Sequence, residues 1–406
     1  MRENESSHVC RDQLGIMDHP EINNQTRAII IGGGPVGWLS ALALARTGLK
    51  TVLVAGDNPL QDQRTIALMQ GSLAFLDEIG VDASSISDAT PLETMRLIDG
   101  TSRLIRAPEV SFQAGEIGHS FFALNIPVSN LVKQIQDVAS THSNFTFKPG
   151  LAQEISFDDE VTVTLESGEI IKADLVVGAD GRQSKVRQAA GIAVRQWDYP
   201  QTAVVTHFHH EKSHQNISTE FHTETGPFTL VPLQGKRCSL VCVVSPDEAE
   251  RLMAVSDAEL SRYIEKRGRH LVGRVSDLGP RQSFPMSSQI ADKMADGRAF
   301  LVGESGHAFP PIGAQGLNLG IRDVEELSKQ VLNLSHASIS DIVIRYNQKR
   351  QLDVKSRTFG VDMLNRSLLT GFLPVQFARG LGLYAAKSFA PLRRTMMRQG
   401  LGAYST

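Results

Sequence analysis

The sequence predicts an α/β fold, in which a Rossmann-like domain is interrupted by a β-sheet segment and followed by a helical C-terminus. A glycine-rich turn lies between an expected strand and an expected helix near the start, within residues 28–55. Further buried strands follow much later, near residues 175–178 and 300–303. Between them lies a stretch in which polar and apolar residues mostly alternate, which is typical of strands with one buried face.

The composition is that of an ordinary globular protein. The 406 residues are 41% hydrophobic and 21% charged, and the net charge of -3 gives no reason to expect nucleic acid as a partner. The three cysteines lack paired spacing, which favours a reducing compartment. Residues 1–26 are polar and predict a flexible tail rather than a signal peptide. No apolar run reaches the 18 residues that indicate a membrane span.

The first expected element is "RAIIIGGGPVGWLSALALARTGLKTVLVAG", which begins at Arg27. It predicts a buried strand, a glycine turn, an Ala- and Leu-rich helix and a second strand that ends at Ala55. The turn fits G-x-G-x-x-G with Gly32, Gly34 and Gly37. In such a unit the glycines let a pyrophosphate approach the positive end of the helix. Ala55 replaces the acid that usually binds the ribose, so the ribose contact is unassigned.

The remaining elements alternate between helices and strands. "DQRTIALMQGSLAFLDEIGV" predicts a helix from Asp62 to Val81. Strands are expected over residues 95–112, 161–178 and most of 197–281, and helices over residues 129–140, 245–253 and 257–268. Cys238 and Cys242 face the same side of a strand and are expected to be small core residues.

Residues 303–320, "GESGHAFPPIGAQGLNLG", place a carboxylate, a hydroxyl and an imidazole within five residues. The spacing is not G-x-S-x-G, and a catalytic triad needs groups held on separate elements. Further metal ligands do not lie at a useful spacing from Glu304 or His307, nor from the histidines of "THFHHEKSH", so no metal site is expected. The glycines and the helix after them favour a loop that holds a flat, anionic ligand.

Three motifs together resemble the single-component FAD-dependent aromatic hydroxylases of the p-hydroxybenzoate hydroxylase type. They are the glycine turn, "DLVVGADGRQSKVR" and "GRAFLVGESGHAFPPIGAQGLNLGIRD". "DQRTIAL", "FFALNIP", "STEFHTETGPFTLVPL" and "PPIGAQGLNLG" resemble, more narrowly, the ubiquinone-biosynthesis hydroxylases of alpha-proteobacteria. The likeness extends from about Arg27 to the C-terminus.

The resemblance implies which residues bind FAD. Arg64 matches an arginine beside the pyrophosphate, Asp180 begins an Asp-Gly element that serves FAD and NAD(P)H, and Glu304 accepts hydrogen bonds from the ribityl chain. The backbone amides at the start of the last helix face the flavin edge that becomes negative on reduction. The expected cofactor contacts are Gly32, Gly34, Gly37, Arg64, Asp180, Gly181, Glu304, Pro311, Gly313, Gly316, Leu317 and Asn318.

Three further residues have more than one interpretation. His307 is a candidate catalytic base or a supporting imidazole beside the flavin. Arg187 serves an ion pair or a pyridine-nucleotide phosphate. Val128 stands where relatives carry a polar residue that contacts the flavin, and with Ala55 it leaves open a weak affinity for FAD.

The implied activity is that of an FAD-dependent monooxygenase. NAD(P)H reduces the flavin, O₂ adds to give a C4a-hydroperoxide, and one oxygen atom passes to the aromatic ring of a polyprenyl phenol in ubiquinone biosynthesis. The alternatives are a hydroxylase of another aromatic ring, an FAD-dependent prenyl reductase, and a non-catalytic member of a quinone-synthesis complex.

The expected domains are discontinuous. Residues 27–92, 118–193 and 284–360 form the FAD-binding domain, residues 93–117 and 194–283 a β-rich substrate domain, and residues 361–406 a basic helical region. After residue 336, eleven Lys and Arg residues stand against three Asp residues. Such a region lies on anionic lipid, docks to a multi-enzyme assembly, or packs on its own flavin domain with a solvated basic rim. The expected location is the cytoplasm, with peripheral contact to the inner membrane.

Overall fold

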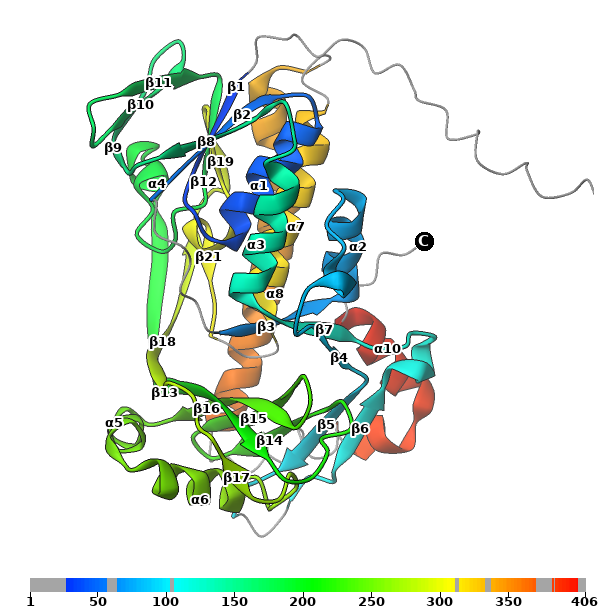
Figure 1. Cartoon of the computed structure of the whole chain (residues 1–406). Helices are drawn as coiled ribbons and strands as arrows, with labels where there is room; N and C mark the ends of the chain where they lie inside the picture. The colour runs from blue at the N-terminus through cyan, green and yellow to red at the C-terminus, as the bar shows by residue number, and fades with distance from the viewer. Residues whose placement is uncertain are drawn as a thin grey trace, which may run out of the picture.

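The computed structural model describes residues 27–56, 64–102, 106–310, 314–332, 337–369, 382 and 384–400. Figure 1 shows two large sheets toward opposite ends of the molecule, connected by the long strands β13 (Val194–His210) and β18 (Gln282–Ala291). These two strands pair with each other, with a shift in register between Asp198 and Thr202. Both strands belong to the nine-stranded sheet, and they extend from it toward the first sheet.

The first sheet is the nucleotide-binding half. It has six strands, in the order β8 (Phe145–Pro149), β2 (Lys50–Ala55), β1 (Arg27–Ile31), β12 (Leu175–Gly178), β20 (Ala299–Leu301) and β19 (Ala295–Asp296). Neighbouring strands are parallel, except that β20 and β19 are antiparallel. Parallel strands covered on both faces are continuous apolar runs, which is why β1, β12 and β20 were recognisable from the sequence. The predicted strands of this sheet are thus confirmed.

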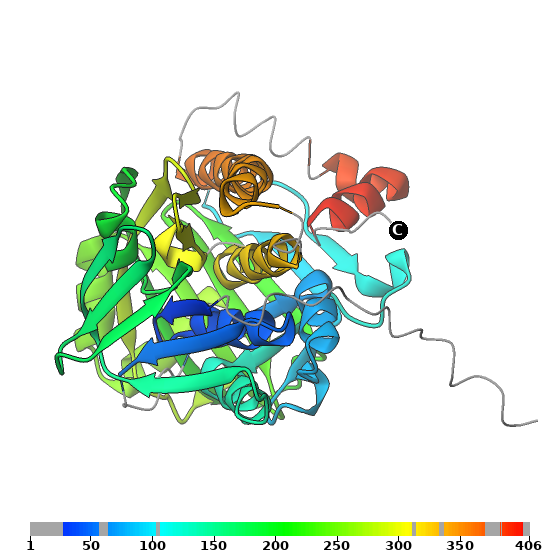
Figure 2. The same cartoon turned by 90° about the horizontal axis from the view of Figure 1, so that it is seen from above.

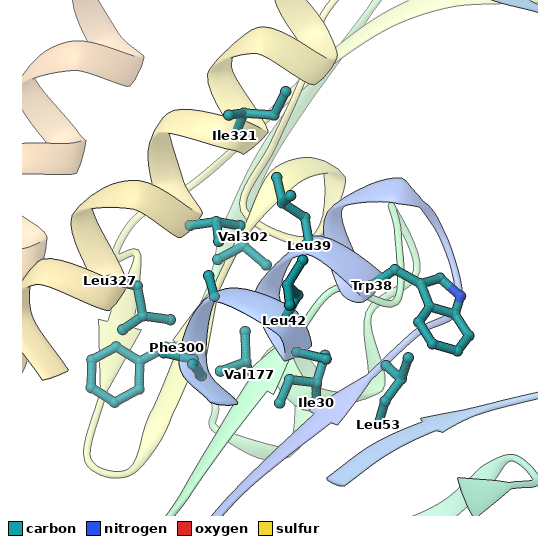
Figure 3. Packing of buried hydrophobic residues seen from close by; sticks show 14 of the residues in the cluster. Ile30, Trp38, Leu39, Leu42, Leu53, Val177, Phe300, Val302, Ile321 and Leu327 are labelled. Carbon is teal, nitrogen blue, oxygen red and sulfur yellow. The ribbon is translucent and has the colours of Figure 1, made fainter. Parts of the chain in front are cut away.

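Helices cover one face of this sheet. In Figures 1 and 2 they lie side by side as α3 (Val128–Ala139), α1 (Pro35–Arg46), α7 (Gln315–Val331) and α8 (Ile339–Leu369). Figure 3 shows Leu39 and Leu42 of α1 packed among Val177 and Phe300 of the sheet and Ile321 of α7. On the other side lie α4 (Lys185–Ala189) and a small sheet of β9 (Ala152–Phe157), β10 (Val161–Leu165) and β11 (Ile170–Ala173).

The second sheet has nine strands. Beyond β13 and β18 it contains β21 (His307–Ala308), β17 (Val275–Ser276), β16 (Arg237–Val244), β15 (Gly226–Leu233), β14 (Ile217–Thr223), β5 (Thr94–Asp99) and β6 (Val110–Gln113). Helices α5 (Pro246–Ala254) and α6 (Asp257–Arg267) pack on one face, over a core that includes Cys238 and Cys242. The expectation that both cysteines are core residues is confirmed.

A small antiparallel sheet lies between the two halves and corrects one prediction. It consists of β3 (Thr65–Met69), β7 (Ala123–Pro127) and β4 (Thr90–Leu92). The helix expected from Asp62 begins only at Gln70, as α2 (Gln70–Glu78), because Thr65–Met69 forms a strand with β7. β-branched residues favour a strand over a helix by only a small free energy, so pairing with a distant strand decides which of the two forms.

The remaining elements are short, apart from α10 (Ala390–Gly400). They are the single-turn helices η1 (Ala83–Ser85), η2 (Ala114–Ile117) and η3 (Gly303–Ser305). Within the described ranges, no helix is long and apolar enough to cross a membrane. Strands β5 and β6 share a sheet with β14, but β18 and β21 join that sheet from the proposed FAD-binding part, so the domain borders stay a prediction.

Candidate cofactor site

The glycine turn after β1 accepts no other residue at two positions. Gly32 has a φ of +123°, and a Cβ there would lie 2.2 Å from the carbonyl oxygen of Ala179. A Cβ on Gly37 would lie 1.8 Å from the carbonyl oxygen of Gly32. Gly34 is different, because no described atom lies within 4 Å of its Cβ position and no side chain caps α1 there. The side of the turn that faces the protein therefore has no room for a side chain, whereas a ligand can approach the turn at the start of α1.

The Asp-Gly element after β12 lies directly against this turn. Asp180 Oδ2 accepts hydrogen bonds from the backbone amides of Lys185 (2.7 Å) and Val186 (3.2 Å). Its Oδ1 is buried and has no hydrogen-bond partner among the described residues. Gly181 has a φ of +78° and no described atom near its Cβ position. An unpartnered buried oxygen beside an open glycine is able to accept a hydrogen bond from a polar group of a ligand.

Glycines also bring the third motif to the same place. A Cβ on Gly303 would lie 3.2 Å from Val36 Cγ2, and a Cβ on Gly320 would lie 2.9 Å from the same atom. The missing side chains let η3 and α7 approach the first turn of α1. Three motifs that are far apart in the sequence therefore border one site.

Glu304 presents its carboxylate at the end of β20. Its side chain is 57% exposed, and Oε2 lies 3.5 Å from Arg182 Nε. Arg182 in turn donates from Nη1 to Ser287 Oγ at 2.5 Å. The carboxylate is thus held loosely and keeps acceptor capacity for hydroxyl groups, so its contact with the ribityl chain remains our prediction.

The start of α7 is fixed by Asn318. Its Oδ1 accepts hydrogen bonds from the amide of Met69 (2.9 Å) and Ser72 Oγ (2.7 Å), and its Nδ2 donates to the carbonyl oxygens of Ala67 (2.8 Å) and Ala314 (2.7 Å). The side chain has no capacity left for a ligand. It acts by tying α7 to β3 and α2.

The other expected contacts on this loop are backbone positions. No described atom lies near the Cβ position of Gly316, and the side chain of Leu317 packs against the core. The amides of the first turn of α7 are the groups that the sequence predicts for contact with a ligand, and this contact stays a prediction. Pro311 and Gly313 lie outside the described residues.

Arg64 stands just before β3. Its carbonyl oxygen accepts a hydrogen bond from the amide of Val128 (3.0 Å), and its guanidinium lies 5.6 Å from the centre of the Phe284 ring. Val128 itself is buried in the core. The contact of Arg64 with a pyrophosphate stays a prediction.

His307 is enclosed rather than presented to a ligand. Its Nε2 lies 2.6 Å from Asp323 Oδ2, and both side chains are fully buried. Asp323 also accepts hydrogen bonds from Arg350 Nε (2.7 Å) and the amide of Gly303 (2.9 Å). Burial alone would raise the pKa of the Asp323 carboxyl, but His307 and Arg350 outweigh it and lower that pKa. A catalytic base must reach a reacting proton, so the contacts favour the supporting role for His307.

The ion pairs around Asp323 extend to the start of α7, which sequence reasoning missed. Asp353 accepts hydrogen bonds from Arg350 Nη1 (2.7 Å) and Arg357 Nε (3.0 Å), and Arg357 Nη1 donates to Gln315 Oε1 (2.9 Å). The spacing of these three α8 residues, three and four apart, was a visible signal of a helical ion-pair ladder. Their link to Asp323 was not visible.

Arg187 contacts backbone groups of two motifs. Its guanidinium is buried and donates to the carbonyl oxygens of Ser305 (2.7 Å) and Arg182 (2.7 Å). Burial lowers the pKa of Arg187 and the charge of Asp180 opposes that shift, and the contact of Arg187 with a nucleotide phosphate stays a prediction. Arg187 joins the Asp-Gly element to η3.

These groups suit FAD. The glycine turn and the start of α1 would offer amides to a pyrophosphate, to which Arg64 would add a cation, and Asp180 Oδ1 and Glu304 would accept hydrogen bonds from hydroxyl groups. The start of α7 offers a second set of amides. This donor and acceptor set matches an extended dinucleotide with two phosphates and a ribityl chain.

Comparison with known proteins also indicates an FAD site. Residues 25–357 match the FAD binding domain family. The chain is 32% identical over 385 residues to the ubiquinone hydroxylase UbiL of Rhodospirillum rubrum, across 92% of this chain and 89% of that protein. It is 29% identical to the 3-demethoxyubiquinol 3-hydroxylase of Escherichia coli, across 94% and 99%.

Among solved structures, p-nitrophenol 4-monooxygenase PnpA of Pseudomonas putida superposes with a TM-score of 0.76 at 22% identity, across 94% of this chain and 99% of that one. At this identity the likeness shows the fold. The family match, in contrast, includes all three motifs of the site. The chain therefore belongs to the FAD-binding-domain family of flavin-dependent monooxygenases, within the group of the ubiquinone-biosynthesis hydroxylases.

Proposed function

We propose that this monooxygenase uses NAD(P)H and O₂ to hydroxylate the aromatic ring of a polyprenyl phenol intermediate in ubiquinone biosynthesis. The observation that carries the proposal is the 32% identity to a ubiquinone hydroxylase across 92% of the chain. The structure of the site supports the proposal, because three motifs that are far apart in the sequence border one site.

FAD, when bound, supplies the hydride-accepting and oxygen-activating chemistry. The chain itself supplies position and electrostatics. The free amides at the start of α7 favour negative charge at the flavin edge, and Asn318 holds that helix end in place. Glu304 and Asp180 would accept hydrogen bonds from hydroxyl groups of the cofactor, and Arg64 would neutralise charge on its pyrophosphate.

We further propose that the C-terminal helices contact an anionic membrane surface, from which a polyprenyl substrate is taken. Around α10 the large apolar side chains of Tyr384, Phe389 and Met396 are exposed. Lys387, Arg394 and Arg398 are exposed among them. Mixed cationic and apolar side chains of this kind are typical of helices that lie on anionic lipid.

Deletion of the gene tests the substrate. The expected result is accumulation, by mass, of a quinone precursor that lacks one ring hydroxyl, and an unchanged quinone pool would contradict the proposal. The purified protein should be yellow and consume O₂ together with NAD(P)H and the precursor. Turnover without O₂ would favour the alternative, a prenyl reductase.

Sedimentation with vesicles tests the membrane contact. We expect binding to vesicles that contain anionic lipid, weakened by salt and by the double change of Arg394→Gln and Arg398→Gln. Retention in the supernatant with every vesicle would contradict it and favour docking to a protein assembly.

A further inference from the structure

A pocket of about 520 Å³ in the second half of the molecule is lined by Glu248 of α5, by residues at the C-terminal end of α6 and by the strands beside them. On β16, Val244 lines the pocket and shares its face with the buried Leu240. Ser239 points to the opposite face, where its Oγ accepts a hydrogen bond from Thr65 Oγ1 (3.2 Å) on β3. Because side chains alternate along a strand, the pocket and the cofactor site lie on opposite faces of the nine-stranded sheet.

The lining of this pocket is cationic. Lys266, Arg267 and Arg269 line it, and Glu248 is the acidic residue among its lining side chains. The Glu248 carboxylate is already paired, since Arg251 donates to it from Nε (2.7 Å) and Nη2 (2.8 Å). The exposed ammonium of Lys266 has no hydrogen-bond partner in the part of the chain that the structure describes. The pocket therefore presents uncompensated positive charge.

Both arginine guanidinium groups lie over aromatic rings. The Arg267 guanidinium lies 5.5 Å from the centre of the Tyr263 ring, and its Nε donates to Tyr263 Oη (3.2 Å). Arg269 lies 5.7 Å from the centre of the Phe221 ring and donates from Nη2 to the carbonyl oxygen of Asp99 (2.8 Å). Fixed guanidinium groups lose little entropy when they bind a ligand.

The backbone that places Arg269 is costly. Arg269 and His270 have φ angles of +49° and +53°, a left-handed conformation that two consecutive residues with side chains rarely adopt. The dipole of α6 favours cations at its C-terminal end, which accounts for Lys266 and Arg267. It does not account for Arg269, which lies beyond the helix and is turned back over Phe221.

We propose that this pocket binds a soluble phosphorylated metabolite, with its phosphate between Lys266, Arg267 and Arg269. The N–H groups that Arg267 and Arg269 do not use within the described chain form planar forks, which match phosphate oxygens better than a single carboxylate does. Thr223 and Thr225 donate their hydroxyl protons to backbone carbonyls, so the cations carry the recognition. The volume exceeds that of a phosphate and leaves space for an organic part beside Tyr263.

Calorimetric titration of the FAD-loaded enzyme tests this proposal. The probes are inorganic pyrophosphate and adenosine 5′-phosphate, at constant ionic strength. We expect one site per chain for at least one probe, and a loss of affinity of about tenfold in Lys266→Gln and in Arg267→Gln. Arg262→Gln is the matched control, because Arg262 is an exposed cation on α6 outside the pocket, and its affinity should not change.

Three results would overturn the proposal. They are the absence of saturable binding to the wild-type enzyme, an equal loss of affinity in Arg262→Gln, and unchanged affinity in both pocket variants. Loading with FAD fills the cofactor site, so binding there does not imitate a positive result. Lys266 is exposed, and an unchanged melting temperature of Lys266→Gln will show that its effect on binding does not come from misfolding.

Discussion

At the scale of single residues, the glycines of the cofactor site differ in what they do. Gly37 is a packing position, because its Cβ would collide with the carbonyl oxygen of Gly32 at 1.8 Å. Gly34 has ordinary backbone angles and open space beside it. The first is needed for the turn to form, and the second is needed for a ligand to approach.

Replacing each glycine by alanine should separate these roles. Gly37→Ala should lower both the melting temperature and the flavin content, since backbone must move. Gly34→Ala should keep the melting temperature of the FAD-free protein but weaken FAD binding about tenfold or more, because a methyl group meets the pyrophosphate. Flavin absorbance per protein measures the FAD content, and thermal unfolding measures the melting temperature. Gly360→Ala on α8, which has open space, is the control, and an equal effect there would refute the distinction.

Asp323 is a second residue whose environment decides its role. It is fully buried, contacts His307, Arg350 and Gly303, and its pKa is held below the ordinary 3.8. A carboxyl whose pKa is lower in the folded state stabilises the fold above its unfolded pKa. This contribution is lost as the pH falls through the folded value.

Asp323→Asn should therefore destabilise the protein at neutral pH by about 3–5 kcal/mol, because it leaves Arg350 buried beside a neutral group. The difference in the free energy of unfolding between this variant and the wild type should shrink below about pH 4, because protonation of Asp323 then removes the ion pair from the wild type as well. Urea unfolding at a series of pH values measures this. Asp77→Asn removes an exposed carboxylate and should change little; a pH-independent difference for Asp323→Asn would argue against the ion pair.

At the scale of elements, α10 shows how one helix serves two surfaces. Met397 is buried against Ala114 and Phe122, and Arg393 donates from Nε and Nη2 to the Glu116 carboxylate. This ion pair lowers the pKa of Glu116. One side of α10 thus packs on Ala114 and Glu116, which the sequence assigned to the substrate domain, and on Phe122, which it assigned to the FAD-binding domain. Exposed side chains elsewhere on α10 are available for the proposed membrane contact.

Glu116→Gln should loosen this attachment by about 1 kcal/mol. The expected result is faster tryptic cleavage at the basic residues of α10, followed by mass spectrometry, with unchanged flavin content. Glu160→Gln breaks an exposed ion pair with Lys172 elsewhere and should not change the cleavage rate. Equal cleavage of all three proteins would show that the Arg393 contact does not hold α10.

At the scale of the whole molecule, the cofactor site couples distant parts of the chain. The described residues that border it are 32–37, 180–181, 303–304 and 314–318, and Asn318 joins the last of these to β3 and α2. A ligand held by all of them binds only the folded state. Its binding free energy therefore adds to global stability.

Removal of FAD should lower the melting temperature of the entire protein in one transition. At FAD concentrations one hundred times the Kd, the expected stabilisation is about 2.7 kcal/mol, and it should rise with the logarithm of FAD concentration. Differential scanning calorimetry of the stripped and reloaded protein measures this. A transition that does not respond to FAD would mean that the three motifs do not share a ligand.

The sequence alone determined the nucleotide-binding half and its site to a large extent. Continuous apolar runs, the glycine turn and the start of α7 depend on steric and periodic rules that act over a few residues. The strands around Gly32 and Asp180 and the helix at Gly316 were therefore predictable. Family resemblance added FAD, because the order of three motifs is more specific than any one of them.

Only the tertiary structure decided the rest. Thr65–Met69 is a strand because β7 pairs with it, the buried His307 contacts Asp323, which also binds Arg350, and Arg187 donates to the carbonyl oxygen of Ser305. The cationic pocket arises where α6 meets β14. In each case the deciding partner lies far away in the sequence, and pairing and burial energies exist only once the chain has brought both partners together.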